Sequence, residues 1–255
     1  MPPKNTKPAP TKPPVKSGAT ALKPPKTTVK TAPVQSAAGS YVLKQMPKNG
    51  EVDHYTLYQP QPLPGGVIAH INIKIILSYS NVTSSGFTRT TRITSLDPSD
   101  LISKVPASGR EQLKQRLAAQ SAQIIKASTV QTFTPSGRPT SIKIVGGPAG
   151  MKPPTETPGI TLIEFPDHAV KIGDSWSSPS GPDEDTCTLI KMTEVNGQKV
   201  AVVSIVTTIA PSSAVKVSRT ARFFVSNGLL QSSTTVQSET KNGKTLSATT
   251  EITKV

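Results

Sequence analysis

The chain has 255 residues, which is enough for one large β domain or two small ones. Its formal net charge is +14, and its single cysteine, Cys187, excludes an internal disulfide. No stretch approaches the ~18 apolar residues that span a membrane, so an integral membrane helix is not expected.

Residues 1–48 are predicted to form a disordered, cationic arm. Residues 1–50 contain nine lysines and no acidic residue, and ten prolines fall within 1–48. Such a composition buries too little apolar surface to offset chain entropy, and proline pairs favour an extended spacer. An alternative role is to hold nucleic acid or an anionic surface through its lysines. The arm has no arginine and only Tyr41 as an aromatic residue, so it is poorly suited to base stacking.

The arm is followed by one β-rich domain, residues 49–255, with halves 49–146 and 159–255 joined by a Gly/Pro loop. In the first half, apolar residues alternate with polar ones over 67–79, which is typical of a long half-buried strand. Shorter strands are predicted at 52–58, 87–95, 129–134 and 140–145. The glycines of the loop precede no helix, so a phosphate-binding loop is not expected.

A single long helix is predicted over 109–127, with a capping box from Ser108 to Glu111 at its start. Leu113 and Leu117 begin an apolar stripe that we expect to cover the inner face of the sheet. The long strand exceeds this helix in length, which predicts an apolar groove between the two. The predicted ligand wall consists of Val67, Ile71, Ile73, Ile75, Leu77, Leu113 and Leu117.

The stretch from Phe165 to Trp176 connects the two halves and holds the only tryptophan. Ile160–Phe165 is expected to form a short strand leading into it. Pro166 and Gly173 are placed at turns, and the large ring of Trp176 is expected to be buried. We therefore interpret Pro166, Gly173 and Trp176 as a structural clasp.

The second half is predicted to be an antiparallel meander. Asn-Gly pairs at 196–197, 227–228 and 242–243 separate alternating runs, and this pair is the strongest short signal for a hairpin. Strands are expected at 186–195, 198–209, 215–226, 229–240 and 244–254. Leu246 and Ile252 suggest that the strand at 244–254 still faces a core.

The candidate chemical groups have simpler structural explanations. His54 and His70 lie on adjacent predicted strands, but no third ligand has zinc-like spacing. The acidic cluster Asp183-Glu-Asp185 matches no calcium loop and is expected to serve solubility. Cys187 has no local histidine to activate its thiol and is expected to be a small buried residue. No metal ligand and no cofactor-binding residue is predicted.

A hydrolytic triad is not predicted either. Asp167, His168, Asp174 and Ser175 are close in sequence, but Ser175 is not in the Gly-x-Ser-x-Gly elbow that exposes a nucleophilic serine. No catalytic residue is therefore assigned, and a hydrolase is only a third choice.

The segment from Pro166 to Trp176, followed by long hairpins and by Phe223-Phe-Val-Ser-Asn-Gly-Leu-Leu230, resembles exported bacterial β-rich domains of unassigned function. These domains resemble the half-barrel of lipoprotein carriers, in which a curved antiparallel sheet wraps a helix. The resemblance covers about residues 50–255. It implies no catalytic residue, and it implies an extracytoplasmic location, periplasmic or elsewhere in the cell envelope. The chain as written shows neither a signal peptide nor a lipid-attachment cysteine, so this location requires that a signal peptide was removed, and a cytoplasmic location is expected otherwise.

We therefore expect a mainly β fold, with a large curved antiparallel sheet and one long amphipathic helix on its concave face. The expected function is a non-enzymatic, envelope-associated binding or scaffold module that holds a lipid or another apolar ligand between sheet and helix. The alternative is a soluble structural domain whose basic arm binds nucleic acid or anionic surfaces nonspecifically.

Overall fold

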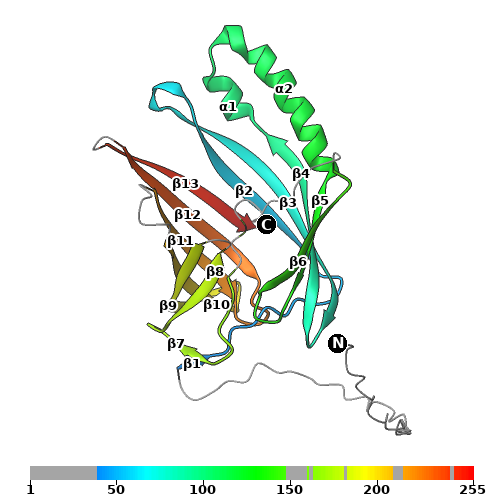
Figure 1. Cartoon of the computed structure of the whole chain (residues 1–255), viewed down its shortest axis with the longest axis vertical. Coiled ribbons are helices and arrows are strands. Elements are labelled where there is room, and N and C mark those ends of the chain that lie inside the picture. The colour runs from blue at the N-terminus through cyan, green and yellow to red at the C-terminus, as the bar shows by residue number, and fades with distance from the viewer. Residues whose placement is uncertain (1–38, 148–159, 161–162, 181–182, 209–214, 242–243) are drawn as a thin grey trace, which may run out of the picture. The chain divides into compact units, whose positions relative to one another are not determined.

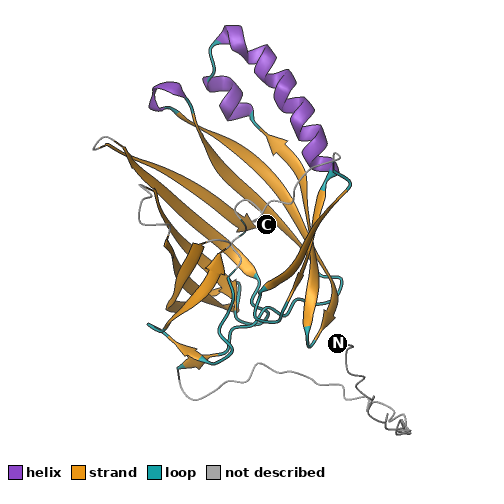
Figure 2. Ribbon diagram, viewed as in Figure 1, coloured by secondary structure: helices purple, strands orange, loops and turns teal. Residues whose placement is uncertain are grey.

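An open antiparallel sheet of eleven strands forms the body of the protein (Figures 1 and 2). The computed structural model describes residues 39–147, 160, 163–180, 183–208, 215–241 and 244–255. The strand order is β6-β5-β4-β3-β2-β13-β12-β11-β10-β9-β8, so β6 and β8 are the edges and the sheet is not closed into a barrel. The predicted fold class, mainly β with one large antiparallel sheet and little helix, is confirmed.

The helical elements are α1 (Ser99–Lys104), α2 (Ala107–Lys126) and the 3-10 turn η1 (Pro64–Gly66). The strands of the large sheet are β2 (Val52–Pro62), β3 (Ile68–Thr83), β4 (Gly86–Asp97), β5 (Ser128–Phe133), β6 (Pro139–Val145), β8 (Ser175–Ser180), β9 (Asp183–Val195), β10 (Gln198–Thr208), β11 (Val215–Phe224), β12 (Leu230–Lys241) and β13 (Lys244–Lys254). A separate pair joins β1 (Ser40–Tyr41) to β7 (Val170–Lys171).

The two halves of the sheet meet at one short ladder, which we call the seam. In the seam, Tyr55 to Tyr58 of β2 pair with Lys254 to Glu251 of β13. Beyond Tyr58, β2 continues in register with β3 alone, while β13 remains paired with β12. The β2–β3 hairpin and the β12–β13 hairpin therefore diverge toward the end of the sheet that carries the helices, which we call the open end (Figure 1).

Alternation along the strands defines an inner face with the apolar core. Leu57 of β2 stands opposite Ile73 of β3 and Ile252 of β13, and all three are buried. Because side chains alternate between the two faces of a strand, the inner residues of β3 continue as Ile75, Leu77 and Tyr79. The alternation predicted over 67–79 is thus real, and the strand runs on to Thr83.

Coil segments, and not the long helix, fill the inner face at the end opposite the helices (Figure 2). We call residues 42–47 and 163–165 the plug, and its side chains Leu43, Ile163 and Phe165 are buried. The plug bonds to both halves: the amide of Gln45 donates to Pro135 O at 2.9 Å, and the amide of Met46 donates to Asn227 O at 2.7 Å. It therefore links the two halves of the sheet below the seam.

The plug corrects two expectations. The arm predicted for 1–48 ends earlier, because the chain pairs in β1 at Ser40–Tyr41 and Leu43 enters the core. Residues 1–38 lie outside the described residues. The short strand expected over 160–165 is coil at its described positions, where Phe165 bonds through its amide to Ser136 O at 2.7 Å.

Helix α2 lies along β4 at the open end, and none of its residues is buried. Leu113, Leu117 and Ile125 are half-buried, as expected for a stripe with helical spacing. The predicted capping box is wrong: the N-cap is Pro106, and no side chain caps the helix. Proline already has a φ suited to the start of a helix, so the helix begins directly after it and Ser108 falls inside the first turn.

The hairpin turns follow the Asn-Gly prediction in part. Asn196 and Gly197 have φ of +50° and +76°, the two positive values that a type I′ turn requires. At 227–228 only Gly228 has positive φ, and a Cβ there would lie 2.1 Å from Lys44 O. This turn is wider because it bends around the plug. The pair at 242–243 lies outside the described residues, although Lys241 and Lys244 on either side pair as expected.

Candidate ligand-binding groove

The inner face continues past the seam toward the open end, where no strand bridges β2 and β13 among the described residues. From Ile252 toward the β12–β13 turn, the side chains of β13 on the inner face are Thr250, Ala248 and Leu246, because every second residue of a strand lies on the same face. They face the space that opens as β2 and β3 turn away. A cavity of about 410 Å³ occupies this space. We call it the groove.

The tip of the β2–β3 hairpin and the inner faces of β12 and β13 line the groove. Its apolar lining is Pro60, Pro62, Leu63, Gly66, Val67, Ile68, Leu246 and Ala248. Its polar lining is Gln59, Thr235, Gln237, Glu239, Ser247 and Thr250. Within the described part of this lining, Glu239 is the only ionisable side chain.

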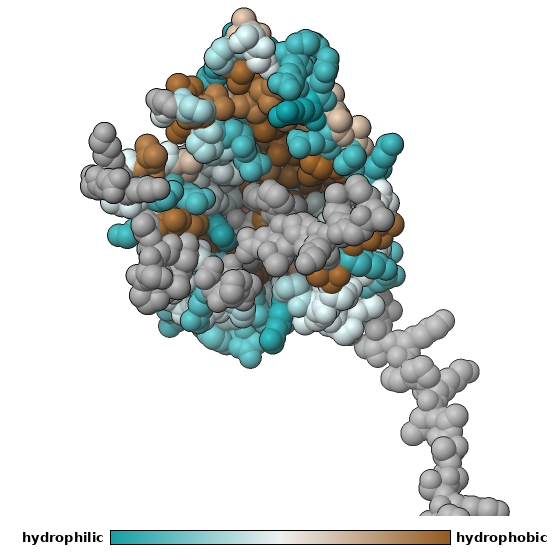
Figure 3. Space-filling model, turned by 45° about the horizontal axis from the view of Figure 1, so that its top comes forward, coloured by the Kyte–Doolittle hydropathy of each residue, from teal (hydrophilic) through white to brown (hydrophobic). Residues whose placement is uncertain are grey.

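Several apolar side chains of the groove are in contact with water. The exposed fractions are 44% for Val67, 36% for Ile68 and 68% for Leu246. Figure 3 looks toward this end of the molecule and shows apolar residues gathered beside the polar helix. Contiguous exposed apolar surface is uncommon on a monomeric soluble fold and usually marks a binding surface.

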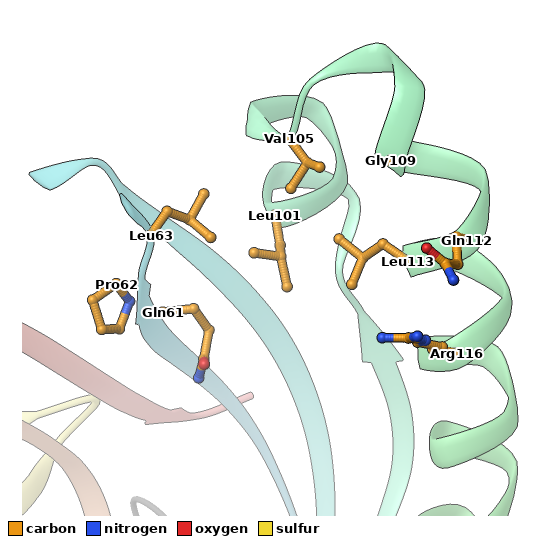
Figure 4. Close-up of a pocket in the computed structure, with 9 residues that line it drawn as sticks. All are labelled: Gln61, Pro62, Leu63, Leu101, Val105, Gly109, Gln112, Leu113 and Arg116. Atoms are coloured by element: carbon orange, nitrogen blue, oxygen red, sulfur yellow. The ribbon is translucent and has the colours of Figure 1, made fainter. Parts of the chain in front are cut away.

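A second cavity, of about 440 Å³, lies on the other side of the β2–β3 tip, and we call it the helix cavity (Figure 4). Leu63 from the tip, Leu101 and Val105 from α1 and its end, and Leu113 from α2 extend toward one another across it (Figure 4). Pro62 and Leu63 line both cavities. The tip is therefore a partition between two apolar spaces.

Polar contacts fix α1 to the start of β3 and so shape the helix cavity. A carboxylate oxygen of Asp100 accepts from the His70 amide at 2.8 Å and from Lys104 Nζ at 2.9 Å. Lys104 Nζ also donates to Ile68 O at 2.8 Å. The Lys104 contact, together with the His70 amide, lowers the pKa of the Asp100 carboxyl. Tyr58 stacks on the His70 ring with centroids 4.1 Å apart, which completes the contact.

Arg110 ties α2 to α1. Its Nε donates to Val105 O at 2.8 Å, and its Nη2 donates to Ser103 O at 2.9 Å. These carbonyls end α1 and lack partners within the helix, so a cation there is favourable. The two helices thus form one braced unit beside the β2–β3 tip.

The residues of the predicted ligand wall do not lie together in one cavity. The groove contains Val67, and the helix cavity contains Leu113. Leu117 is half-buried on α2, and Ile71 is partly buried against the core. The remaining members, Ile73, Ile75 and Leu77, lie in the filled core. Sequence reasoning missed the lining from β12 and β13, although Leu246 and Ala248 alternate with polar residues there.

The predicted clasp residues lie at the junction between the plug and β8. Trp176 was expected to be buried and is half-buried, because it lies on the edge strand β8. Its Nε1 donates to Glu164 O at 2.9 Å. Gly173 has a φ of +96° and forms the expected turn, and Pro166 is half-buried beside Phe165 of the plug.

The candidate metal and triad residues are not assembled into a site. His54 stands opposite Ile76 and His70 opposite Pro60, so the two histidines are separated along the hairpin. The His168 ring contacts Asp167 at 3.1 Å on the surface, while Ser175 Oγ bonds to Thr188 Oγ1. Within the described part of the chain, no group of three or more His, Cys, Asp or Glu could hold a metal ion.

Asp185 and Cys187 are buried on the inner face of β9. The Asp185 carboxylate accepts from Thr207 Oγ1 at 2.6 Å and contacts Arg219 Nη1 at 3.4 Å. Asp185 was expected to be a solvated acidic residue. It lies two residues before the buried Cys187, so it shares the inner face of β9, and the sequence analysis overlooked this alternation. Cys187 is buried as predicted, and burial, with the nearby Asp185 charge, raises the pKa of its thiol to about 12.

A second set of buried polar side chains lies on the inner face of β2, β4, β5 and β13. Asp53 Oδ1 pairs with Lys254 Nζ at 2.5 Å, and Arg89 Nη2 donates to Gln131 Oε1 at 2.6 Å. Arg89 also stacks over the Phe133 ring, 4.8 Å from its centroid, and burial lowers the pKa of its guanidinium. These contacts stabilise the filled end of the sheet and do not line either cavity.

Comparisons with known proteins give one distant structural neighbour. No protein-family model and no curated protein matches the sequence. Among solved structures, the chain is similar to a candidate outer membrane lipoprotein-sorting protein domain from Vibrio parahaemolyticus, at 10% identity and a TM-score of 0.20, over 80% of this chain and 82% of that one.

The structure contains no described helix that is long and apolar enough to cross a membrane.

Proposed function

We propose that the protein is a non-enzymatic binding module that holds the acyl chain of a lipid, or a similar apolar ligand, in the groove. The observation that carries this proposal is the exposure of Val67, Ile68 and Leu246 around one cavity at the open end. The volume of about 410 Å³ is within the ~300–1,000 Å³ of typical small-molecule sites.

The physical gain from a ligand is the removal of this apolar surface from water. Each methylene that leaves water contributes about 0.8 kcal/mol, so an acyl chain can offset the entropy lost on binding. The polar lining of the groove is mostly uncharged, as Gln59, Thr235 and Gln237 illustrate. Such a lining is compatible with a chain that enters from the open end and leaves its polar group near water.

An envelope location belongs to the same proposal, because lipid ligands are encountered there. The sequence upstream of the native gene tests it: a signal peptide or lipid-attachment cysteine would support export, and a cytoplasmic start would contradict it.

A direct test is the titration of the purified full-length chain with a fluorescent fatty acid, together with native mass spectrometry of the protein as purified. The variant Leu246→Asp puts a charge into the groove and is expected to weaken binding at least tenfold. Val206→Asp is the matched control, because Val206 is exposed on β10 and lines neither cavity. Unchanged binding in Leu246→Asp, or no binding by the native chain, would contradict the proposal.

A second candidate function rests on the charge of the arm. Nine lysines without an acidic residue in 1–50 suit nonspecific binding to nucleic acid or to an anionic surface. Such binding should weaken steeply with salt, with a slope of about −0.9 per phosphate contact. Deleting residues 1–38 should abolish it, and binding that survives the deletion would assign it to the folded domain.

A further inference from the structure

The helix cavity differs from the groove in the sign of its charge. Its apolar wall is made by Leu63, Leu101, Val105 and Leu113, and among its described lining residues the ionisable one is Arg116. Among the described residues that line the groove, the ionisable one is Glu239. The described linings of the two cavities on either side of the β2–β3 tip therefore carry opposite charges.

Arg116 is available for a ligand. It lies on α2 one turn after Gln112, and its side chain extends below Leu113 toward the cavity, with Gln61 of β2 on the opposite wall (Figure 4). Among the described residues, Arg116 forms no ion pair. Two other cations near the helix cavity have partners, because Arg110 bonds to the carbonyls that end α1 and Lys104 pairs with Asp100.

We propose that the helix cavity binds the anionic head group of a single-chain amphiphile, with Arg116 as the residue that recognises the charge. This inference rests on the proposed function and adds the charge of the ligand to it. A guanidinium offers two parallel N–H donors, which match the two oxygens of a carboxylate or phosphate. Gln112 on α2 and Gln61 on the opposite wall supply further amide donors to the cavity (Figure 4).

The apolar wall and the exposed cation suit the two parts of an amphiphile. Leu101 is buried, Leu63 and Leu113 are half-buried beside it, and Arg116 is exposed, so the leucines can cover an alkyl chain while the head group meets Arg116 near water. Hydrogen bonds between a guanidinium and an anion are stronger than those between neutral groups. The alkyl chain then lies along the leucines of the helix cavity. A cationic amphiphile would meet Arg116 instead and be repelled.

The test is calorimetric titration of the full-length chain with four ligands that share one dodecyl or lauroyl chain: laurate, monododecyl phosphate, dodecanol and dodecylamine, all below their critical micelle concentrations. The variants are Arg116→Gln and, as a matched control, Lys114→Gln. Lys114 is an exposed cation of the same helix that does not line the cavity. We expect laurate or the phosphate to bind more tightly than dodecanol, and dodecylamine to bind most weakly.

Arg116→Gln should weaken binding of the anionic ligands about tenfold, or about 1.4 kcal/mol, and leave dodecanol unchanged, whereas Lys114→Gln should leave all four unchanged. The ratio of phosphate to carboxylate affinity then assigns the head group, and either order supports the inference. Equal binding of laurate and dodecanol, or equal losses in the two variants, would overturn the inference and leave the proposed function standing. If none of the four ligands binds, both fail.

Discussion

The plug gives the most direct prediction about stability. Phe165 is 2% exposed and meets Phe223 edge to face, with centroids 5.2 Å apart and an interplanar angle of 84°. Phe165→Ala removes this ring from the centre of the inner face, where its neighbours are held by strands and cannot close the space. Truncation of a buried phenylalanine costs about 3–5 kcal/mol of unfolding free energy.

The matched comparison is Leu117→Ala on α2. Leu117 belongs to the stripe that sequence analysis expected to cover the sheet, but it is only half-buried. Its truncation should cost about 1–2 kcal/mol, because a half-buried side chain removes less apolar area from water on folding than a buried one does. If the helix were the main cover of the inner face, the order of the two values would be reversed.

Urea denaturation at 25 °C, followed by far-ultraviolet circular dichroism, measures both variants against the native chain. The slope of free energy with urea should stay constant, so that the shift in midpoint reports stability alone. A loss for Leu117→Ala equal to or larger than that for Phe165→Ala would refute the assignment of the plug as the core filler.

Three further predictions follow from single contacts. Gly228→Ala should cost about 2 kcal/mol more than Gly197→Ala in the same denaturation assay, since both have positive φ but only Gly228 meets a backbone carbonyl; equal losses would show that the carbonyl moves freely. Cys187 should not react with a thiol reagent at pH 8 in the native state, because its thiol pKa is raised to about 12, and should react fully in denaturant; native labelling would contradict its burial. Lys254→Met should cost about 3 kcal/mol, because it leaves the buried Asp53 carboxylate without its cation, and adding Asp53→Asn should restore part of the loss; additive losses in the double variant would argue against coupling.

Periodicity made most of the sheet predictable. The alternation of Ile73, Ile75 and Leu77 with polar residues identified β3 and the face that it buries, because side chains on a strand alternate strictly. Hairpin order followed from Asn196–Gly197, where the turn type depends on two residues alone. The side-chain alternation and the turn type each depend on residues that are neighbours in the sequence, so both could be predicted from it.

The plug could not be predicted in the same way. Leu43 stands in a segment rich in lysine and proline, and nothing in its neighbours indicates that it enters the core of a sheet. Ile163 and Phe165 were interpreted as a strand because they are apolar and alternate, yet they are coil at the described positions. Burial of such segments depends on tertiary contacts with remote turns, which no local pattern encodes.

The position of the candidate site could not be predicted from the sequence. An apolar groove was expected from the mismatch between a long strand and a short helix, and most of the strand residues named for it belong to the filled core. Leu246 was expected to face a core because it shares the parity of Ile252. Leu246 is exposed because β2 diverges from β13 beyond the seam. The length of the seam depends on how β2 and β13, which are far apart in the sequence, pair with each other.

The seam also constrains how the protein is made. Each half is a meander of sequential hairpins, so its contacts can form as the chain leaves the ribosome. The pairing of Leu57 with Ile252, by contrast, has to wait until β13 has been synthesised. Until then β2 is an unpaired edge, open to pairing with another nascent chain. A chain that stops before β13 should therefore form two separate sheets, in which β2 and β12 are unpaired edge strands. We expect this product to aggregate, even though every strand of the first half is intact.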